Sequence, residues 1–195
     1  LHRSQNSIGK DIRRGLIAQG RDPDSPVVLV GHSQGALASL RYAIDHPKQV
    51  LHVFSVGAPW HGSRSAARVA RLVGLTRRNI TPALTDMAAG SEFLTRLHDD
   101  LPVIADRVTN IYSTHEIVIS PYTHAHIDIP GVENILIATQ PEYRRHLETF
   151  PEYPLDGYIE ARVTHLGEMN TPEVRAIIWE RVEEISASLR PGGNA

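Results

Sequence analysis

Short apolar runs alternate with helical patterns along most of the chain. The continuous run Val27–Val30 predicts a strand that is buried on both faces, and the run Val50–Val56 predicts a second apolar strand. Weaker runs at Arg107–Tyr112 and Asn134–Ala138 predict a third and a fourth strand. Strands that alternate with helices are typical of a parallel sheet built from right-handed crossovers. The pattern therefore predicts the α/β class.

Apolar residues at helical spacing predict helices around these strands. The first covers Ser4–Gly20, and the second runs from the first strand to about Asp45. A last helix begins with Thr171 as its N-cap and Pro172 in its first turn. Its expected buried face consists of Val174, Ile177, Ile178, Val182 and Ile185.

Two segments interrupt this alternation. Residues 64–101 are helical in pattern, contain no convincing strand, and are expected to form a small helical cap or lid inserted between two strands. Residues 139–160 contain Pro141, Pro151 and Pro154 and are expected to be an irregular insertion. The length of 195 residues suits one domain over residues 1–195.

Composition narrows the classes of function. The chain is 41% hydrophobic and 22% charged, as in ordinary globular proteins. A net charge of −2 argues against nucleic acid as a partner. No apolar run reaches the length of about 18 residues that a membrane-spanning helix needs. The chain has no cysteine, which excludes disulfides and a cysteine nucleophile.

The pentapeptide Gly31-His32-Ser33-Gln34-Gly35 stands between the first predicted strand and a helix. A G-x-S-x-G sequence in this context is typical of a nucleophile elbow, with the Ser33 hydroxyl above the carboxyl end of the sheet. Side chains at Gly31 and Gly35 are expected to collide with the neighbouring strand and helix. The Gln34 N–H would lie at a helix N-terminus and stabilise an oxyanion. The alternative is a glycine-rich turn with an ordinary serine.

A serine nucleophile needs a base and an orienting carboxylate. Glu116 follows the third strand directly, and His165 comes late in the chain. The order Ser33, Glu116, His165 is that of α/β-hydrolases. Weaker alternatives are Asp86, Asp106 and Asp128 for the acid and His146, expected at the surface, for the base.

Together these motifs resemble a bacterial lipase and esterase family of α/β-hydrolases. The segments that carry the resemblance are Gly31–Gly35, Val56–Ser63, Met87–Leu94, Ser113–Pro121 and His165–Val174. The resemblance covers most of residues 4–185 and implies an α/β-hydrolase-like parallel sheet flanked by helices. It also implies Ser33 as nucleophile, His165 as base and Glu116 as acid, where the family usually carries Asp.

The resemblance implies further that residues 64–101 lie over an acyl pocket. Candidates for this substrate pocket are His32, Trp60 and His61, with the His32 side chain expected below the turn. The family takes its second oxyanion donor from a loop after an earlier strand, and nothing before Val27 predicts that strand. We therefore expect Val27–Val30 at a sheet edge, where it is an aggregation hazard. A preceding segment or a second chain would cover this edge.

The expected function is that of a serine hydrolase that cleaves small-molecule or lipid carboxylic esters through an acyl-enzyme, with no cofactor. Acyl transfer by the same triad and a catalytically silent binding module are the alternatives. The eleven histidines suggest a third alternative, a metal-dependent hydrolase. In this alternative His124, His126 and Asp128 would lie on one face of a short strand.

Overall fold

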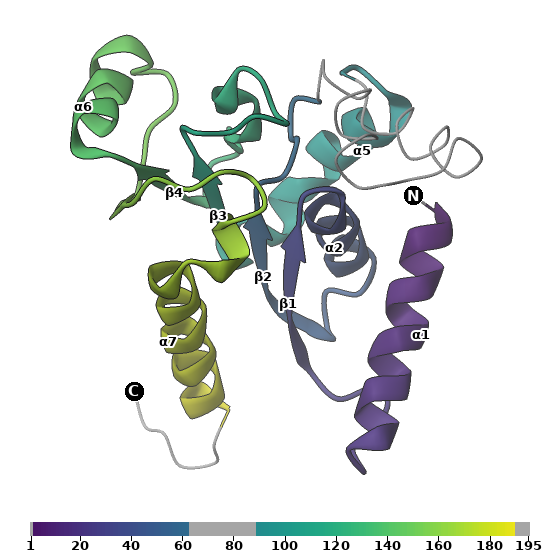
Figure 1. Cartoon of the computed structure of the whole chain (residues 1–195). Coiled ribbons are helices and arrows are strands. Elements are labelled where there is room, and N and C mark those ends of the chain that lie inside the picture. Colours follow the sequence, from purple (N-terminus) through teal and green to yellow (C-terminus); the bar gives the residue numbers. More distant parts are fainter. Residues whose placement is uncertain (1, 63–88, 190–195) are drawn as a thin grey trace.

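The computed structural model describes residues 2–62 and 89–189, and its centre is one sheet of five parallel strands (Figure 1). The strand order is β1-β2-β3-β4-β5, so that each strand pairs with the next one along the chain. The bounds are β1 (Val27–His32), β2 (Val50–Val56), β3 (Val108–Ser113), β4 (Glu133–Ala138) and β5 (Gly157–Glu160). The expected α/β class with a parallel sheet is confirmed.

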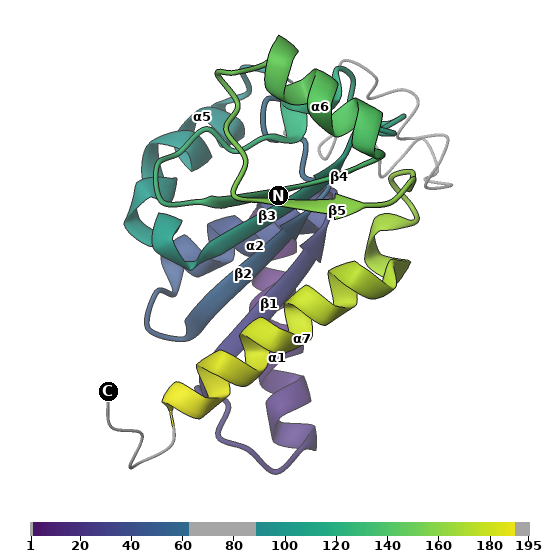
Figure 2. The same ribbon diagram turned by 90° about the vertical axis from the view of Figure 1, so that its left-hand side faces the viewer.

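Helices cover both faces of the sheet (Figure 2). One face carries α1 (His2–Ala18), α2 (Gln34–Asp45) and α5 (Glu92–Asp100), and the other carries α7 (Pro172–Ser188). Helix α6 (Gln140–Thr149) follows β4. Three 3-10 helices complete the description: η1 (Leu101–Arg107), η2 (Tyr122–Ala125) and η3 (Glu168–Asn170). No helix of the described ranges has the length and apolarity needed to cross a membrane.

Apolar burial holds the middle of the sheet in place. Leu37 and Leu40 of α2 pack with Val53 of β2 in the larger core, which also includes Leu97 of α5. A smaller core beneath α7 contains Val56, Ile111, Ile137 and Val174. Because β2 contributes to both cores, its side chains are buried on both faces, as is typical of a central parallel strand.

Strand β1 differs from β2 because it pairs on one side only. Among the described strands, none pairs with its other edge, which confirms the expected position at the edge of the sheet. Val27, Val28 and Leu29 are half-buried and Val30 is 42% exposed. The expectation that this strand is buried on both faces is therefore wrong, because burial of an edge strand is incomplete. The expectation that a preceding segment or a second chain covers the edge of β1 stays a prediction.

The expectation of an irregular segment over residues 139–160 is also wrong. Residues 140–149 form α6 and residues 157–160 form β5. Pro141 lies in the first turn of α6, where a missing N–H costs nothing. Thr139 and Glu142 close a capping box, in which the Thr139 N–H donates to the Glu142 carboxylate at 2.9 Å. The prolines therefore mark the boundaries of regular structure.

Helix α7 begins where the sequence predicts, but its expected buried face is less buried than predicted. Val174 is buried, whereas the other four residues of the expected buried face are half-buried. Thr171 occupies the N-cap position, yet its hydroxyl donates to the Gly167 carbonyl at 3.1 Å and does not cap the helix.

Most of the expected cap at residues 64–101 lies outside the described residues. Its last part forms α5, whose Ser91 N-cap accepts a hydrogen bond from Leu94 N at 3.2 Å. Leu94 and Leu97 belong to the main core. This end of the segment therefore belongs to the packed body of the protein.

Candidate active site

Ser33 occupies a sharp turn between β1 and α2. Its φ of 55° and ψ of −125° make it the only non-glycine residue with positive φ in the described ranges. Such a conformation stores strain and is found mostly at functional sites. The Ser33 N–H donates to the Val56 carbonyl at 2.8 Å, which fixes the turn to the carboxyl end of β2.

The two glycines of the pentapeptide have different surroundings. A Cβ on Gly31 would lie 2.6 Å from the Ala36 Cα, so the expected collision at Gly31 is confirmed. A Cβ on Gly35 would meet no described atom within 4 Å, so the same expectation for Gly35 is wrong. Gly35 is exposed in the first turn of α2, where a side chain has room. The neighbouring Gln34 opens α2, and its N–H belongs to the group that has no acceptor within the helix.

Glu116 and His165 form a buried hydrogen-bonded pair. The Glu116 Oε2 lies 2.7 Å from the His165 Nδ1, with side-chain exposures of 0% and 4%. The other carboxyl oxygen of Glu116 accepts a hydrogen bond from the Val118 N–H at 3.0 Å. An Nδ1–H that donates to the carboxylate leaves Nε2 with a free lone pair. The pair therefore has the arrangement of an oriented general base.

His165 lies close to the turn that carries Ser33. The His32 Nε2–H donates to the His165 carbonyl at 2.8 Å, and the two ring centroids are 4.5 Å apart. A Cβ on Gly57, directly after β2, would be 3.2 Å from the His165 Nδ1. The ends of β1 and β2 thus meet the His165 loop, although the Ser33 hydroxyl makes no hydrogen bond to His165 or to any other described residue.

Glu168 is a residue of this site that the sequence analysis missed. It is fully buried, and its Oε2 is 3.6 Å from the His32 Nε2 and 3.9 Å from the His165 Nδ1. Its spacing of three residues from His165 is the one sequence signal that could have drawn attention to it.

His32, His165 and Glu168 bring three potential ligand atoms within 4.8 Å of one another. However, one nitrogen of each ring donates a hydrogen bond. The His32 Nε2 donates to the His165 carbonyl, and the His165 Nδ1 donates to Glu116. A metal ligand needs a lone pair at these positions. The hydrogen-bond roles in this cluster therefore do not fit a metal ion.

The metal arrangement named as an alternative does not form. Residues 122–125 are a 3-10 helix and not a strand. His124 Nδ1 donates to the Gly62 carbonyl at 3.2 Å, whereas the His126 Nδ1 lies 3.1 Å from the Tyr112 hydroxyl. Asp128 accepts a hydrogen bond from the Trp60 Nε1 at 3.0 Å. Because each side chain has its own partner, the three do not form a cluster of potential ligands within the described ranges.

The alternatives for acid and base lie elsewhere. Asp86 is outside the described residues, Asp106 belongs to η1, and Asp128 pairs with Trp60. His146 is fully buried, so its expected surface position is wrong. It contacts the Tyr122 hydroxyl at 2.9 Å and the Tyr153 carbonyl at 3.1 Å and is therefore a structural residue of α6.

The three candidates for the substrate pocket have different surroundings. His32 is half-buried against His165, as described above. Trp60 is fully buried and stacks on His98 with ring centroids 4.0 Å apart. His61 is half-buried, with its Nε2 3.5 Å from Asp128, and burial lowers its pKa. Their role in substrate binding stays a prediction.

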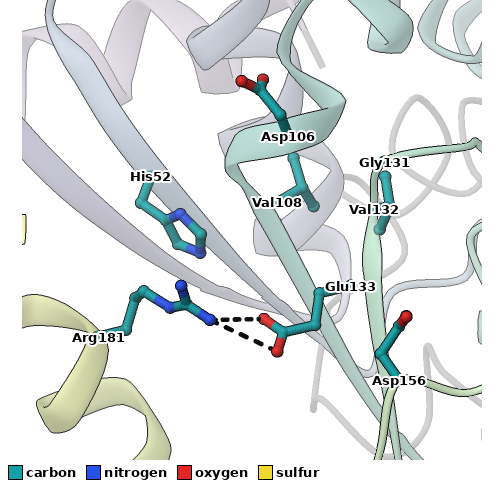
Figure 3. Close-up of a pocket in the computed structure, with 8 residues that line it drawn as sticks. All are labelled: His52, Asp106, Val108, Gly131, Val132, Glu133, Asp156 and Arg181. Carbon is teal, nitrogen blue, oxygen red and sulfur yellow. Dashed lines mark hydrogen bonds and ion pairs between the residues drawn. The ribbon is translucent and has the colours of Figure 1, made fainter. Parts of the chain in front are cut away.

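A polar pocket lies at the end of the sheet opposite to Ser33 (Figure 3). Its volume is about 360 Å³, and it is lined by His52, Asp106, Val108, Gly131, Val132, Glu133, Asp156 and Arg181. Arg181 pairs with Glu133 at 3.2 Å, and Thr109 donates to the same carboxylate at 2.6 Å. The His52 Nε2 donates to Thr109 at 2.9 Å. These groups pair with one another near the amino ends of the strands and do not belong to the Ser33 site.

An open parallel sheet with polar side chains gathered beyond its carboxyl ends has the layout of α/β enzymes that bind ligands at this edge. The family model described as alpha/beta hydrolase fold matches residues 21–117, the segment from before β1 to just beyond Glu116. The chain is therefore a protein of the α/β-hydrolase fold. The resemblance inferred from its motifs is confirmed at this level.

One solved structure supports this fold, and two others are also similar to the chain. The chain is similar to an α/β-hydrolase enzyme from the metagenome of sediments from the lagoon of Mar Chica, Morocco, at 15% identity and a TM-score of 0.54. That match covers 93% of this chain and 71% of the other. A monoacylglycerol lipase from Paleococcus ferrophilus matches at 18% identity over 92% and 74% of the two chains, with a TM-score of 0.38. A hydrolase from Pseudomonas aeruginosa matches at 14% identity over 90% and 71%, with a TM-score of 0.44. No curated protein matches the chain significantly in sequence.

Proposed function

We propose that this protein is a serine hydrolase that cleaves carboxylic esters of small molecules or lipids through an acyl-enzyme. The observation that carries the proposal is the buried hydrogen bond of 2.7 Å between Glu116 and His165. The strained turn at Ser33, at the same end of the sheet, adds to its support. A buried acid and base pair beside a strained serine is the arrangement that nucleophilic catalysis by serine requires.

In the proposed mechanism Glu116 holds the His165 ring so that Nε2 faces the substrate side. Nε2 takes the proton of the Ser33 hydroxyl as Oγ attacks the ester carbonyl carbon. The N–H of Gln34, at the N-terminus of α2, donates to the oxyanion of the tetrahedral intermediate. His165 then passes the proton to the departing alcohol. Water, activated by the same ring, attacks the acyl-enzyme and releases the acid and free Ser33.

The fold adds support, because an α/β sheet of this kind presents the residue after β1 at its carboxyl edge. The metagenomic relative of similar fold is itself described as a hydrolase enzyme.

A catalytically silent binding module is the second candidate. One observation favours it: the Ser33 hydroxyl makes no hydrogen bond to His165 or to any other described residue. A protein whose serine and histidine do not come into contact would keep the fold and lack the chemistry.

Labelling with a fluorophosphonate probe, followed by peptide mapping, distinguishes the two candidates. A serine hydrolase becomes modified at Ser33, and Ser33→Ala and His165→Ala abolish the label. Ser188→Ala, at an exposed serine near the end of α7, is the matched control and keeps the label. Absence of label on the folded wild-type chain contradicts the serine hydrolase and favours the silent module.

A further inference from the structure

Glu168 is a carboxyl group that the fold buries without a hydrogen-bond partner. It opens η3, and its side chain has no exposed surface. Neither of its carboxyl oxygens receives a hydrogen bond within the described ranges. Buried polar groups are nearly always paired, and an unpaired one in a native structure points to a special role.

The carboxyl group lies between the two histidine rings of the candidate active site. Its Oε2 is 3.6 Å from the His32 Nε2 and 3.9 Å from the His165 Nδ1. These distances are too long for hydrogen bonds, but charges interact strongly across them in a buried site. A Cβ on Gly57 would come within 2.3 Å of Oε2, and the φ of Gly57 is +56°. A glycine at this position therefore lets the carboxyl group approach both rings.

Two carboxyl groups thus face one imidazole ring, and their surroundings differ. Glu116 is hydrogen-bonded through both of its oxygens, whereas Glu168 is hydrogen-bonded through neither. The titratable groups that face Glu168 are His32 from β1, His165 from the loop before η3, and Glu116 from the loop after β3. Burial raises the pKa of Glu168 to about 7, while the contact with His32 opposes the rise and the charge of Glu116 adds to it.

We propose that Glu168 is a positioning residue that couples its own proton to that of His165 and so sets the pH range in which His165 acts as a base. The proposal rests on the function proposed above. It adds a carboxyl group beyond the three residues of the triad.

The physical reason is electrostatic. When His165 accepts the proton of Ser33, an imidazolium forms whose Nδ1 lies 3.9 Å from Glu168. An ionised Glu168 stabilises this cation, whereas a protonated Glu168 does not. The charge of Glu168 therefore bears directly on the step in which His165 takes the proton of Ser33.

The test is the pH dependence of Ser33 labelling by a fluorophosphonate probe. Glu168→Gln keeps the size of the side chain and removes its charge. Loss of a negative charge near His165 moves the acid limb of the labelling profile to lower pH, by about one unit. The matched control is Glu173→Gln at an exposed position in the first turn of α7, which leaves the profile unchanged.

Superimposable profiles for wild type, Glu168→Gln and Glu173→Gln overturn the role of Glu168 and leave the serine hydrolase intact. Absence of label in the wild type at every pH contradicts the proposed function itself.

If Glu168→Gln does not fold, titration of the Glu168 carboxyl by carbon-13 NMR in the otherwise native chain decides the question. The expected midpoint is near pH 7, and His165→Ala raises it because the imidazole whose charge favours the ionised carboxyl group has been removed. A midpoint near pH 4 that does not respond to His165→Ala overturns the proposal.

Discussion

The side chain of His32 holds the backbone of His165, with the Nε2 and carbonyl oxygen 2.8 Å apart. This hydrogen bond joins the last residue of β1 to a loop 133 residues later in the chain. The residue next to the proposed nucleophile therefore also fixes the segment that carries the proposed base.

Replacement of His32 tests this link. His32→Leu leaves the His165 carbonyl without its donor and shifts the loop, and a misplacement of about 1 Å can lower a catalytic rate by about 100-fold. His32→Gln, which restores an N–H donor, recovers part of the rate. The measurement is the rate of Ser33 labelling, with His46→Leu at an exposed position as the control. Equal rates for all four proteins would show that the hydrogen bond does not position His165.

Replacement of Glu116 tests the acid of the proposed triad. Glu116→Gln keeps the volume but removes the charge that orients the ring, so the rate of ester hydrolysis falls by about 10²–10⁴. Glu116→Asp, one methylene shorter, retains more activity than Glu116→Gln. Glu148→Gln, exposed on α6, serves as the control and keeps the wild-type rate. Wild-type activity in Glu116→Gln would assign the acid to another residue.

Gly31 and Gly35 form a natural pair for a stability test. Gly31→Ala places a methyl 2.6 Å from the Ala36 Cα and lowers the free energy of unfolding by about 1–3 kcal/mol. Gly35→Ala enters open space in a helix and stays within about 1 kcal/mol of the wild type. Denaturant unfolding measures both values. A larger loss for Gly35→Ala than for Gly31→Ala would contradict the packing described for this turn.

Two buried histidines predict how stability changes with pH. Burial, assisted by the charge of Arg181, lowers the pKa of His52 to about 4, and burial lowers that of His126 to about 4. In the unfolded chain both titrate near pH 6.5. Between about pH 6.5 and 4 the unfolded state therefore binds more protons, so the free energy of unfolding falls as the pH falls.

Unfolding by denaturant at a series of pH values measures this slope. Replacement of His126 by Gln reduces it, whereas replacement of the exposed His46 leaves it unchanged. A stability that does not vary between pH 6.5 and 4 in the wild type would show that these histidines titrate alike in both states.

The sequence predicts the centre of this fold well because local and long-range signals agree there. An apolar run followed by a G-x-S-x-G turn and a helical pattern leaves one arrangement, and β1, Ser33 and α2 follow it. The pairing of Glu116 with His165 follows from topology, because both come after strands of a parallel sheet.

The sequence does not predict the structure or role of a residue where these depend on its neighbours in space. The prolines of residues 139–160 suggest irregular structure, whereas the structure shows that Thr139 and Glu142 form a capping box and that a helix follows. His146 looks like a surface residue until Tyr122 and Tyr153 enclose it. The surroundings of Glu168 come from β1, β2 and η3, which are far apart in the sequence. No local sequence pattern predicts that these elements come together.

The strand order has a consequence for the way the protein is made. Since each strand pairs with its successor, the sheet can grow in the direction of synthesis, one strand after another. Ser33 follows the first of these strands, and His165 follows the fifth. A ribosome-bound chain that ends before residue 165 can thus display the serine turn without its base, and the site becomes complete only after the segment that follows β5 has emerged.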